Sequence, residues 1–380
     1  MIAQGKNAGN PDGLPSILTK SKAKIRLSKS EFGLLSFGCK WVNFAVHFFK
    51  RKIATLCALA IFALFALFTA VNVSEKTTET AGDYIKWVDF SVTSEAMSKA
   101  YKYDVKTKSE KNHIDWIELL ALCAEKCGGN FKNFDASYME SCADRLKEGA
   151  DADKICLNKK YFDYYKEAYN AVLGGFVGEF YTKKDGEWCE NYGLKAFSPI
   201  AAGYGFSHYK DFGSSRTYGF KRKHLGNDLM GGIGTPIICV ESGTVEVMGW
   251  NRYGGWRVGI RSFDRQRYYY YAHLRKDFPF NTHLKEGDTV SAGEVIGYLG
   301  MTGYSTKENV NNINIAHLHF GMQIIFDEVQ KDGNNEIWID VYEITEFLNK
   351  NRSAVEKIDG EKNHRRKNAF YERLIAENGG

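Results

Sequence analysis

The hydrophobic positions of this 380-residue chain change their spacing along its length, and each spacing predicts a different kind of element. Residues 53–73 are an unbroken apolar run, residues 114–181 place apolar side chains at helical intervals, and residues 197–348 hold short alternating runs separated by glycines. The pattern therefore predicts a multidomain protein. We expect one N-terminal transmembrane helix, a small all-α domain, and a C-terminal all-β domain built on an antiparallel sheet.

The apolar run from Ile53 to Val73 has 21 residues and no charge. As a helix it would be about 32 Å long, enough to cross the hydrocarbon core of a bilayer. The apolar region of a cleaved signal peptide has only about 7 to 15 residues, so an uncleaved anchor is the better interpretation. The aromatic stretch just before this run is either an interfacial amphipathic segment or the start of a longer hydrophobic helix.

Charge is distributed unevenly around this run. Residues 1–52 carry ten Lys and Arg against Asp12 and Glu31, while the other 328 residues hold 41 basic and 44 acidic side chains. The positive-inside rule places the basic leader, residues 1–52, in the cytoplasm and everything after the helix outside the membrane. The prediction is a single-pass cell-membrane protein that contacts the bilayer through one helix, and nothing in its charge suggests a nucleic-acid partner.

Residues 74–112 are polar and are interpreted as a stalk, and residues 113–182 as the helical domain. The segment "IDWIELLALCAEKC" is expected to be a helix that stops at Gly128 and Gly129. The aromatic residues of this domain favour a core rather than a glycan-binding groove. Six cysteines follow the membrane segment, and both disulfides and reduced buried thiols are compatible with their spacing. The charge-dense tail, residues 349–380, is expected to be a solvated helix or disordered.

The stretch "NINIAHLHFGMQII" places two histidines, His317 and His319, one residue apart in a predicted strand. Side chains alternate faces along a strand, so both imidazoles share one face while Leu318 and Phe320 point into the core. An isolated pair of this kind is more often incidental than functional, and it needs partners before it indicates a metal.

Partners for the pair occur in the same domain, residues 197–348. His224 and Asp228 are four residues apart, and His273 ends the strand "YYYYAHL". A catalytic zinc site uses three protein ligands and leaves a fourth position open. His224, Asp228 and one histidine of the pair make such a set, which leaves the other histidine and His273 to transfer protons.

Four ordered motifs in this domain resemble the lysostaphin/LytM-type zinc endopeptidases, which cut peptidoglycan cross-links. They are His224-Leu-Gly-Asn-Asp228, Tyr271-Ala-His273-Leu274, "GDTVSAGEVIGYLGMTGYST" and His317-Leu-His319-Phe320. The resemblance covers about a third of the chain, from Tyr204 to Ile325. It is specific because all four motifs occur in the family's order.

This resemblance implies that Zn²⁺ is bound by His224, Asp228 and His319, and that His273 and His317 are the catalytic pair. It also implies that the substrate is a stem or bridge peptide of peptidoglycan. Tyr218, six residues before the first ligand, could stabilise an oxyanion, although a packing role is favoured.

The chain departs from the family pattern in two places. A longer loop, residues 307–316, precedes the final histidines and could rim the cleft, and Gly321 stands where the family often has Glu.

Two other functional classes share features with this sequence. Some proteins of this fold lack metal ligands and act as non-catalytic regulators that activate other wall hydrolases. The complete set of five site residues favours an enzyme. The hairpin "KEGDTVSAGEVIGYLG" also resembles biotinyl and lipoyl carrier domains, but the modified lysine at the hairpin tip is missing, which excludes that class.

Overall fold

The computed structural model describes residues 90–217, 221–331 and 336–373. The chain divides into two compact units, residues 1–83 and 84–380, and every described residue belongs to the second. The predicted transmembrane helix, residues 53–73, and the leader before it lie outside the described residues. No helix within the described ranges is both long and apolar enough to span a bilayer.

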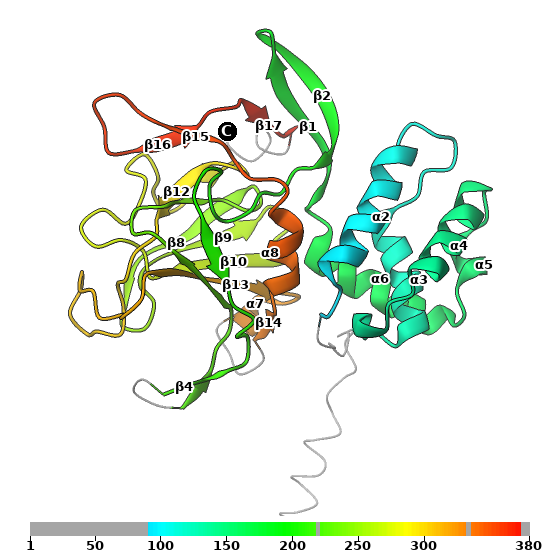
Figure 1. The fold of residues 1–380 in the computed structure, drawn as a ribbon, viewed down its shortest axis with the longest axis horizontal. Coiled ribbons are helices and arrows are strands. Elements are labelled where there is room, and N and C mark those ends of the chain that lie inside the picture. The colour runs from blue at the N-terminus through cyan, green and yellow to red at the C-terminus, as the bar shows by residue number, and fades with distance from the viewer. Residues whose placement is uncertain (1–89, 218–220, 332–335, 374–380) are drawn as a thin grey trace, which may run out of the picture. The chain divides into compact units, whose positions relative to one another are not determined.

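The N-terminal part of the described unit is helical (Figure 1). Its elements are α2 (Ser94–Thr107), α3 (Trp116–Cys127), a short 3₁₀ turn η1 (Phe131–Asn133), α4 (Ala136–Lys147), α5 (Ala152–Ile155) and α6 (Lys159–Leu173). Helix α3 is the central one and packs against α2, α4 and α6. It begins where the Asp115 carboxylate accepts the backbone N–H groups of Ile117 and Glu118, and it ends at Gly128, whose φ is +62°. The stop predicted at this glycine is confirmed.

The stalk predicted for residues 74–112 is corrected in its second half. Residues 94–107 form α2, which is capped by the Thr93 side chain and buries Met97 and Ala100. The error arose because α2 has few apolar residues, and they are buried by α3 and α8, partners distant in sequence. All six described cysteines are free thiols, which agrees with reduced thiols rather than disulfides.

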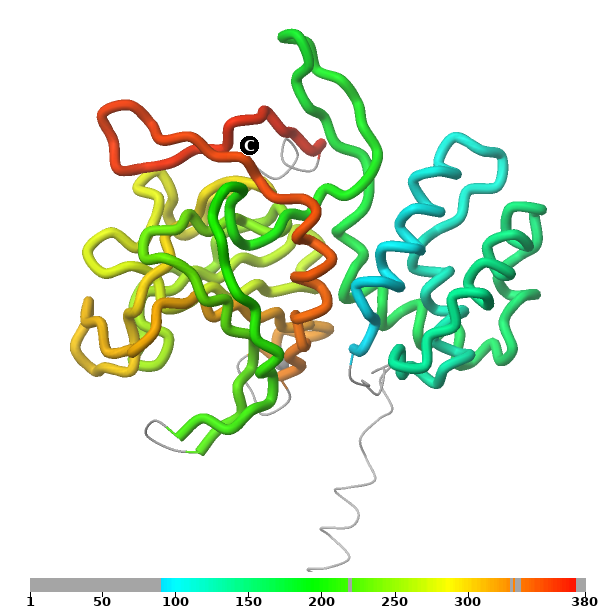
Figure 2. Tube along the Cα trace, in the orientation of Figure 1, coloured from blue at the N-terminus to red at the C-terminus, as the bar shows by residue number. Residues whose placement is uncertain are grey.

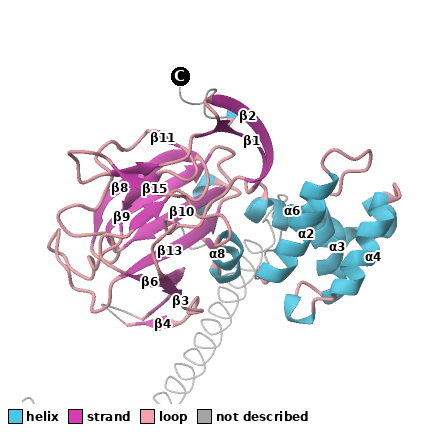
Figure 3. Ribbon diagram, turned by 45° about the horizontal axis from the view of Figure 1, so that its top comes forward, coloured by secondary structure: helices cyan, strands magenta, loops and turns pink. Residues whose placement is uncertain are grey.

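The C-terminal part is built on an antiparallel sheet (magenta in Figure 3). Its strand order is β11 (Thr289–Val290), β8 (Gly243–Asn251), β9 (Gly255–Ser262), β10 (Arg267–Ala272), β13 (His317–Ile324), β6 (Asn227–Gly231) and β3 (Phe206–His208), and β14 (Ile337–Ile339) pairs with the far half of β13. All these pairings are antiparallel, as predicted.

Smaller pairings flank this sheet. They are β7 (Pro236–Ile238) with β12 (Val295–Tyr298), β4 (Ser215–Arg216) with β5 (Arg222–Lys223), β15 (Val355–Lys357) with β16 (His364–Arg366), and β1 (Val177–Lys184) between β2 (Glu187–Leu194) and β17 (Phe370–Tyr371). The helical region predicted for residues 113–182 therefore ends in a strand.

The tail expected to be solvated or disordered is also corrected. Figure 2 shows residues 349–373 running back along the molecule, and β17 pairs with β1. Phe370 is only 8% exposed and packs on Phe180 and Phe197, with ring centroids 5.3 and 5.5 Å apart. The tail is poor in aliphatic residues, so its order depends on partners far away in the sequence.

The helices and the sheet share one hydrophobic core. The remaining short helices are α7 (Glu328–Lys331) and α8 (Tyr342–Leu348). Phe347 of α8 stacks on Trp116 of α3, with ring centroids 5.7 Å apart. The buried Arg267 guanidinium donates to Glu241 and to the carbonyl oxygen of Ala171 in α6. The helical region is therefore bound to the sheet as part of the same compact unit.

Candidate metal centre

The register of three neighbouring strands assembles the site. His319 of β13 lies directly opposite Asp228 of β6 and opposite Ala272 of β10, the residue before His273. His224 lies between β5 and β6, four residues before Asp228. On the other face of β13, Leu318 and Phe320 are 0% and 1% exposed. The predicted division of this strand into a polar face and a core face is confirmed.

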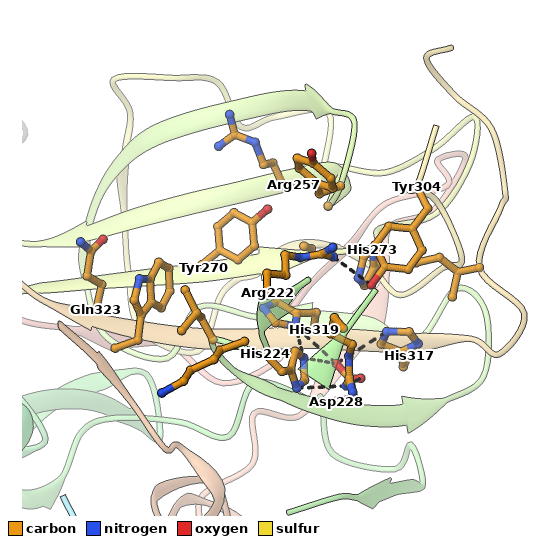
Figure 4. Close-up of a pocket in the computed structure, with 18 of the residues that line it drawn as sticks. Arg222, His224, Asp228, Arg257, Tyr270, His273, Tyr304, His317, His319 and Gln323 are labelled. Atoms are coloured by element: carbon orange, nitrogen blue, oxygen red, sulfur yellow. Dashed lines mark hydrogen bonds and ion pairs between the residues drawn. The ribbon is translucent and has the colours of Figure 1, made fainter. Parts of the chain in front are cut away.

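Three ligand atoms converge between these strands (Figure 4). His224 Nε2 lies 3.0 Å from Asp228 Oδ1 and 2.8 Å from His319 Nδ1, and His319 Nδ1 lies 3.3 Å from Asp228 Oδ1. Tetrahedral ligands bound to zinc at about 2.1 Å lie about 3.4 Å apart, close to these separations. Two imidazole nitrogens and one carboxylate oxygen are also ligand types that zinc accepts. The residues therefore fit a zinc ion with little rearrangement.

His273 and His317 lie beside this triad with their ring orientations fixed. His273 Nδ1 is 2.9 Å from the carbonyl oxygen of Thr302, and His317 Nδ1 is 2.7 Å from that of Ile315. A carbonyl only accepts, so each Nδ1 carries the proton that it donates and each Nε2 keeps a free lone pair. The two ring centroids are 4.8 Å apart, and His317 Nε2 lies 3.6 Å from Asp228 Oδ1. Both imidazoles can therefore accept protons in the cleft.

The backbone of His273 adopts φ +63°, the left-handed region that non-glycine residues rarely occupy. Such conformations cost free energy and occur most often where the surrounding structure positions a functional group. Here the turn after β10 aims the imidazole at the centre of the cleft.

Two residues that could not be predicted from the sequence, Asp211 and Arg216, support the ligands. His224 Nδ1 lies 3.2 Å from both the carbonyl oxygen and the carboxylate of Asp211. Arg216 Nη2 donates to the carboxylates of Asp211 and Asp228, at 2.7 and 2.9 Å. Asp228 therefore keeps one oxygen for the triad while the other is held by Arg216. Neither supporting residue lies in a motif, and only the fold brings them to the site.

The charges of the site shift the pKa values of its histidines. Burial lowers the pKa of His224, but hydrogen bonds to Asp211 and Asp228 outweigh this and raise the pKa to about 9. Burial, reinforced by the neighbouring histidines, lowers the pKa of His273 well below its usual value, and burial also lowers the pKa of His319. Burial raises the pKa of Asp228, but its hydrogen bonds to His224 and His319 lower it overall.

The triad lies in an open cleft of about 790 Å³. Ile313, Asn314 and Ile315, from the extra loop 307–316, line it as the sequence suggested, and Ile315 is 64% exposed. At Gly321 there is no space for a side chain, because an added Cβ would lie 2.7 Å from the Leu225 carbonyl oxygen and 2.9 Å from the Trp338 ring. Tyr218 lies outside the described residues.

A β-sheet cleft with a convergent His-Asp-His triad and two further histidines defines a metallopeptidase type of site. Residues 222–333 match the family model "Peptidase family M23". This chain therefore carries an M23 metallopeptidase domain, of the lysostaphin/LytM type that its motifs resemble.

Known relatives agree with this assignment. The L-Ala–D-Glu endopeptidase of Bacillus subtilis (strain 168) is 33% identical over 177 residues, which is 47% of this chain and 51% of that protein. Lysostaphin of Staphylococcus staphylolyticus is 39% identical over 98 residues, or 26% of this chain and 18% of that protein. This chain thus spans about half the length of the first relative and less than a fifth of the second.

Among solved structures, the catalytic domain of the antimicrobial peptidase lysostaphin from Staphylococcus simulans is 28% identical. It superposes with a TM-score of 0.28, and the match covers 37% of this chain and 92% of that one.

Proposed function

We propose that this protein is a zinc-dependent endopeptidase that hydrolyses peptide cross-links of bacterial peptidoglycan from the outer face of the cytoplasmic membrane. The observation that carries the proposal is the convergence of three ligand atoms, all within 4.8 Å of one another, beside two histidines whose Nε2 atoms are free to accept protons. A structural zinc site would be closed by a fourth protein ligand, whereas catalysis requires an open position.

In this proposal His224, Asp228 and His319 hold the zinc ion. Zinc, when bound, polarises the scissile carbonyl and makes a water molecule more acidic. Arg216 and Asp211 keep Asp228 and His224 in position through the contacts described above.

His273 and His317 transfer the protons. The pKa of His273 is depressed by burial, so this imidazole is neutral near pH 7 and can accept a proton at Nε2. The carbonyl oxygens of Thr302 and Ile315 hold the two rings in the correct tautomer by accepting from Nδ1. The proton that one of these histidines takes from the attacking water would be returned to the leaving amine, directly or through the second imidazole.

Different observations support the proposed substrate and the proposed location. The first relative is an L-Ala–D-Glu endopeptidase and the second is lysostaphin, which supports a peptide of the cell wall as the substrate. The membrane location is supported by the uncharged run at residues 53–73 and the basic leader before it.

The proposal is tested by separating metal ligands from proton carriers. His319→Ala, His224→Ala and Asp228→Ala should each release most of the zinc and abolish hydrolysis, because too few ligands remain. His317→Ala and His273→Ala should keep near-normal zinc while the rate of hydrolysis falls roughly 100-fold to 10,000-fold, the range expected for a removed general acid or base.

Zinc content by mass spectrometry and peptide release from purified sacculi are the two measurements. If His317→Ala loses zinc and His319→Ala retains it, the two roles are reversed. If all five variants keep both zinc and activity, the chemistry lies elsewhere. A zinc-loaded wild-type protein that hydrolyses nothing but increases hydrolysis by another wall enzyme would support the regulator alternative instead.

A further inference from the structure

The cleft carries more positive than negative charge. Its lining includes five cationic side chains, Arg216, Arg222, Lys223, Arg257 and Lys331, but only two carboxylates, Asp228 and Glu336. Arg216 is paired with Asp211 and Asp228, and Lys331 with Glu246. Such an excess favours a substrate that is itself negatively charged.

Arg257 of β9 differs from these paired cations. Within residues 90–217, 221–331 and 336–373 it has no hydrogen-bond or ion-pair partner, and its Nε atom is buried without one. The residue as a whole is half-buried and lines the cleft, so the two Nη groups, which have no acceptor in the described part of the chain, are poised to bind an anion from solution. The two Nη groups of arginine form a planar fork that matches the two oxygens of a carboxylate.

The strand register places this arginine close to the metal centre. Val258 pairs with Tyr271, so Arg257 lies beside Ala272, and Ala272 pairs with His319. The three residues form a row across neighbouring strands, and with strands about 4.8 Å apart the Cα atoms of Arg257 and His319 are about 10 Å apart. An extended peptide advances about 3.3 Å per residue, so a side chain or terminus one or two residues from the scissile bond reaches this position.

Tyr270 of β10 lies on the same face of the sheet as Ala272, two residues along the strand from the row that joins Arg257 to His319 (Figure 4). Its hydroxyl accepts from Asn251 Nδ2 at 3.3 Å, which leaves the hydroxyl proton to donate. Arg257, Arg222 and Tyr270 line the same cleft, and the Tyr270 ring centroid is 5.8 Å from that of His319. Gly249, the partner of Arg257 in β8, has no atom within 4 Å of the place of a side chain, which leaves room for a ligand.

We propose that Arg257, assisted by the Tyr270 hydroxyl, binds a free carboxylate of the peptide substrate next to the scissile bond. The chain would therefore prefer an acidic peptide to an uncharged glycine peptide. This inference rests on the proposed endopeptidase function and specifies the class of its substrate.

The test compares two peptides that differ in one charge. One contains L-Ala–D-Glu with the free carboxylate of the glutamate ionised, and the other has that carboxylate converted to an amide; pentaglycine is the neutral control. The zinc-loaded full-length chain should show a kcat/KM at least about tenfold higher for the acid. Arg257→Gln should remove this advantage, mainly by raising KM, and leave the amide unchanged, while Arg257→Lys should restore part of it. Arg252→Gln, an exposed arginine of the same hairpin, is the matched control and should change nothing.

Equal losses on both peptides in Arg257→Gln would indicate a structural role and overturn the inference, as would a wild-type protein without preference for the acid. If the zinc-loaded chain hydrolyses neither peptide, the proposed function fails. The affinity of the chain for the acid and amide peptides, measured by calorimetry, then tests the inference separately. Tighter binding of the acid that is lost in Arg257→Gln would support it, and equal binding of acid and amide would refute it.

Discussion

His224 lies at the centre of the charge network of the site. Its Nε2 faces Asp228 and His319, and its Nδ1 faces Asp211. The two carboxylates raise the pKa of this imidazole to about 9 against the cost of burial, so it is protonated at pH 7 in the metal-free protein. Only the neutral imidazole can be a ligand, so zinc must displace this proton.

Zinc binding should therefore release close to one proton at pH 7. The apparent affinity for zinc should rise about tenfold per pH unit as the pH increases toward 9 and then level off, because above the pKa no proton competes with the metal. Calorimetry of the metal-free chain in buffers with different ionisation enthalpies measures the number of protons released. Asp211→Asn should lower the pKa of His224 and reduce the release, and an unchanged release in this variant would contradict the assigned cause.

At the scale of elements, β13 and its two neighbours explain why the site could be predicted. His317 and His319 are recognisable because a strand alternates its faces, and His224, Asp228 and His273 because each lies in a short local motif. Asp211, Arg216 and Arg257 could not be predicted, since none of them lies in a motif: Asp211 and Arg216 are brought to the ligands by hydrogen bonds, and Arg257 by the pairing of β9 with β10.

The fold, too, could be predicted from the sequence only in part. The antiparallel sheet followed from alternating runs, but α2 and β17 are stabilised by non-local packing that leaves little trace in their own residues.

The contact between α6 and the sheet gives a prediction at this scale. Arg267 is 1% exposed and is bound by Glu241 and by the Ala171 carbonyl. Arg267→Met should leave Glu241 buried without its charge partner and lower the free energy of unfolding by about 3–5 kcal/mol. Arg265→Gln is the matched control, because this surface arginine pairs with Glu328 in solvent and should change stability by less than about 1 kcal/mol. Denaturant unfolding of both variants measures the difference, and equal effects would show that the buried network does not hold the two regions together.

At the scale of the whole molecule, the proposed function requires residues 84–380 to lie outside the membrane. The charge asymmetry around residues 53–73 predicts that a protease added to intact protoplasts will degrade residues 84–380 and spare the leader, residues 1–52. Antibodies to each end of the chain report the two fragments. Protection of the C-terminal unit would place it on the inner side and would rule out a function at the cell wall.

We propose that this chain cuts peptidoglycan peptides with a zinc ion held by His224, Asp228 and His319. The most direct measurement is digestion of purified sacculi by the full-length chain as isolated, after removal of metal with a chelator, and after zinc is restored, with the released peptides identified by mass. We predict peptides with new amino termini before chelation, none after it, and full recovery with about one zinc per chain. Release that is unaffected by chelation, or no release from a chain that holds one zinc, would contradict the account.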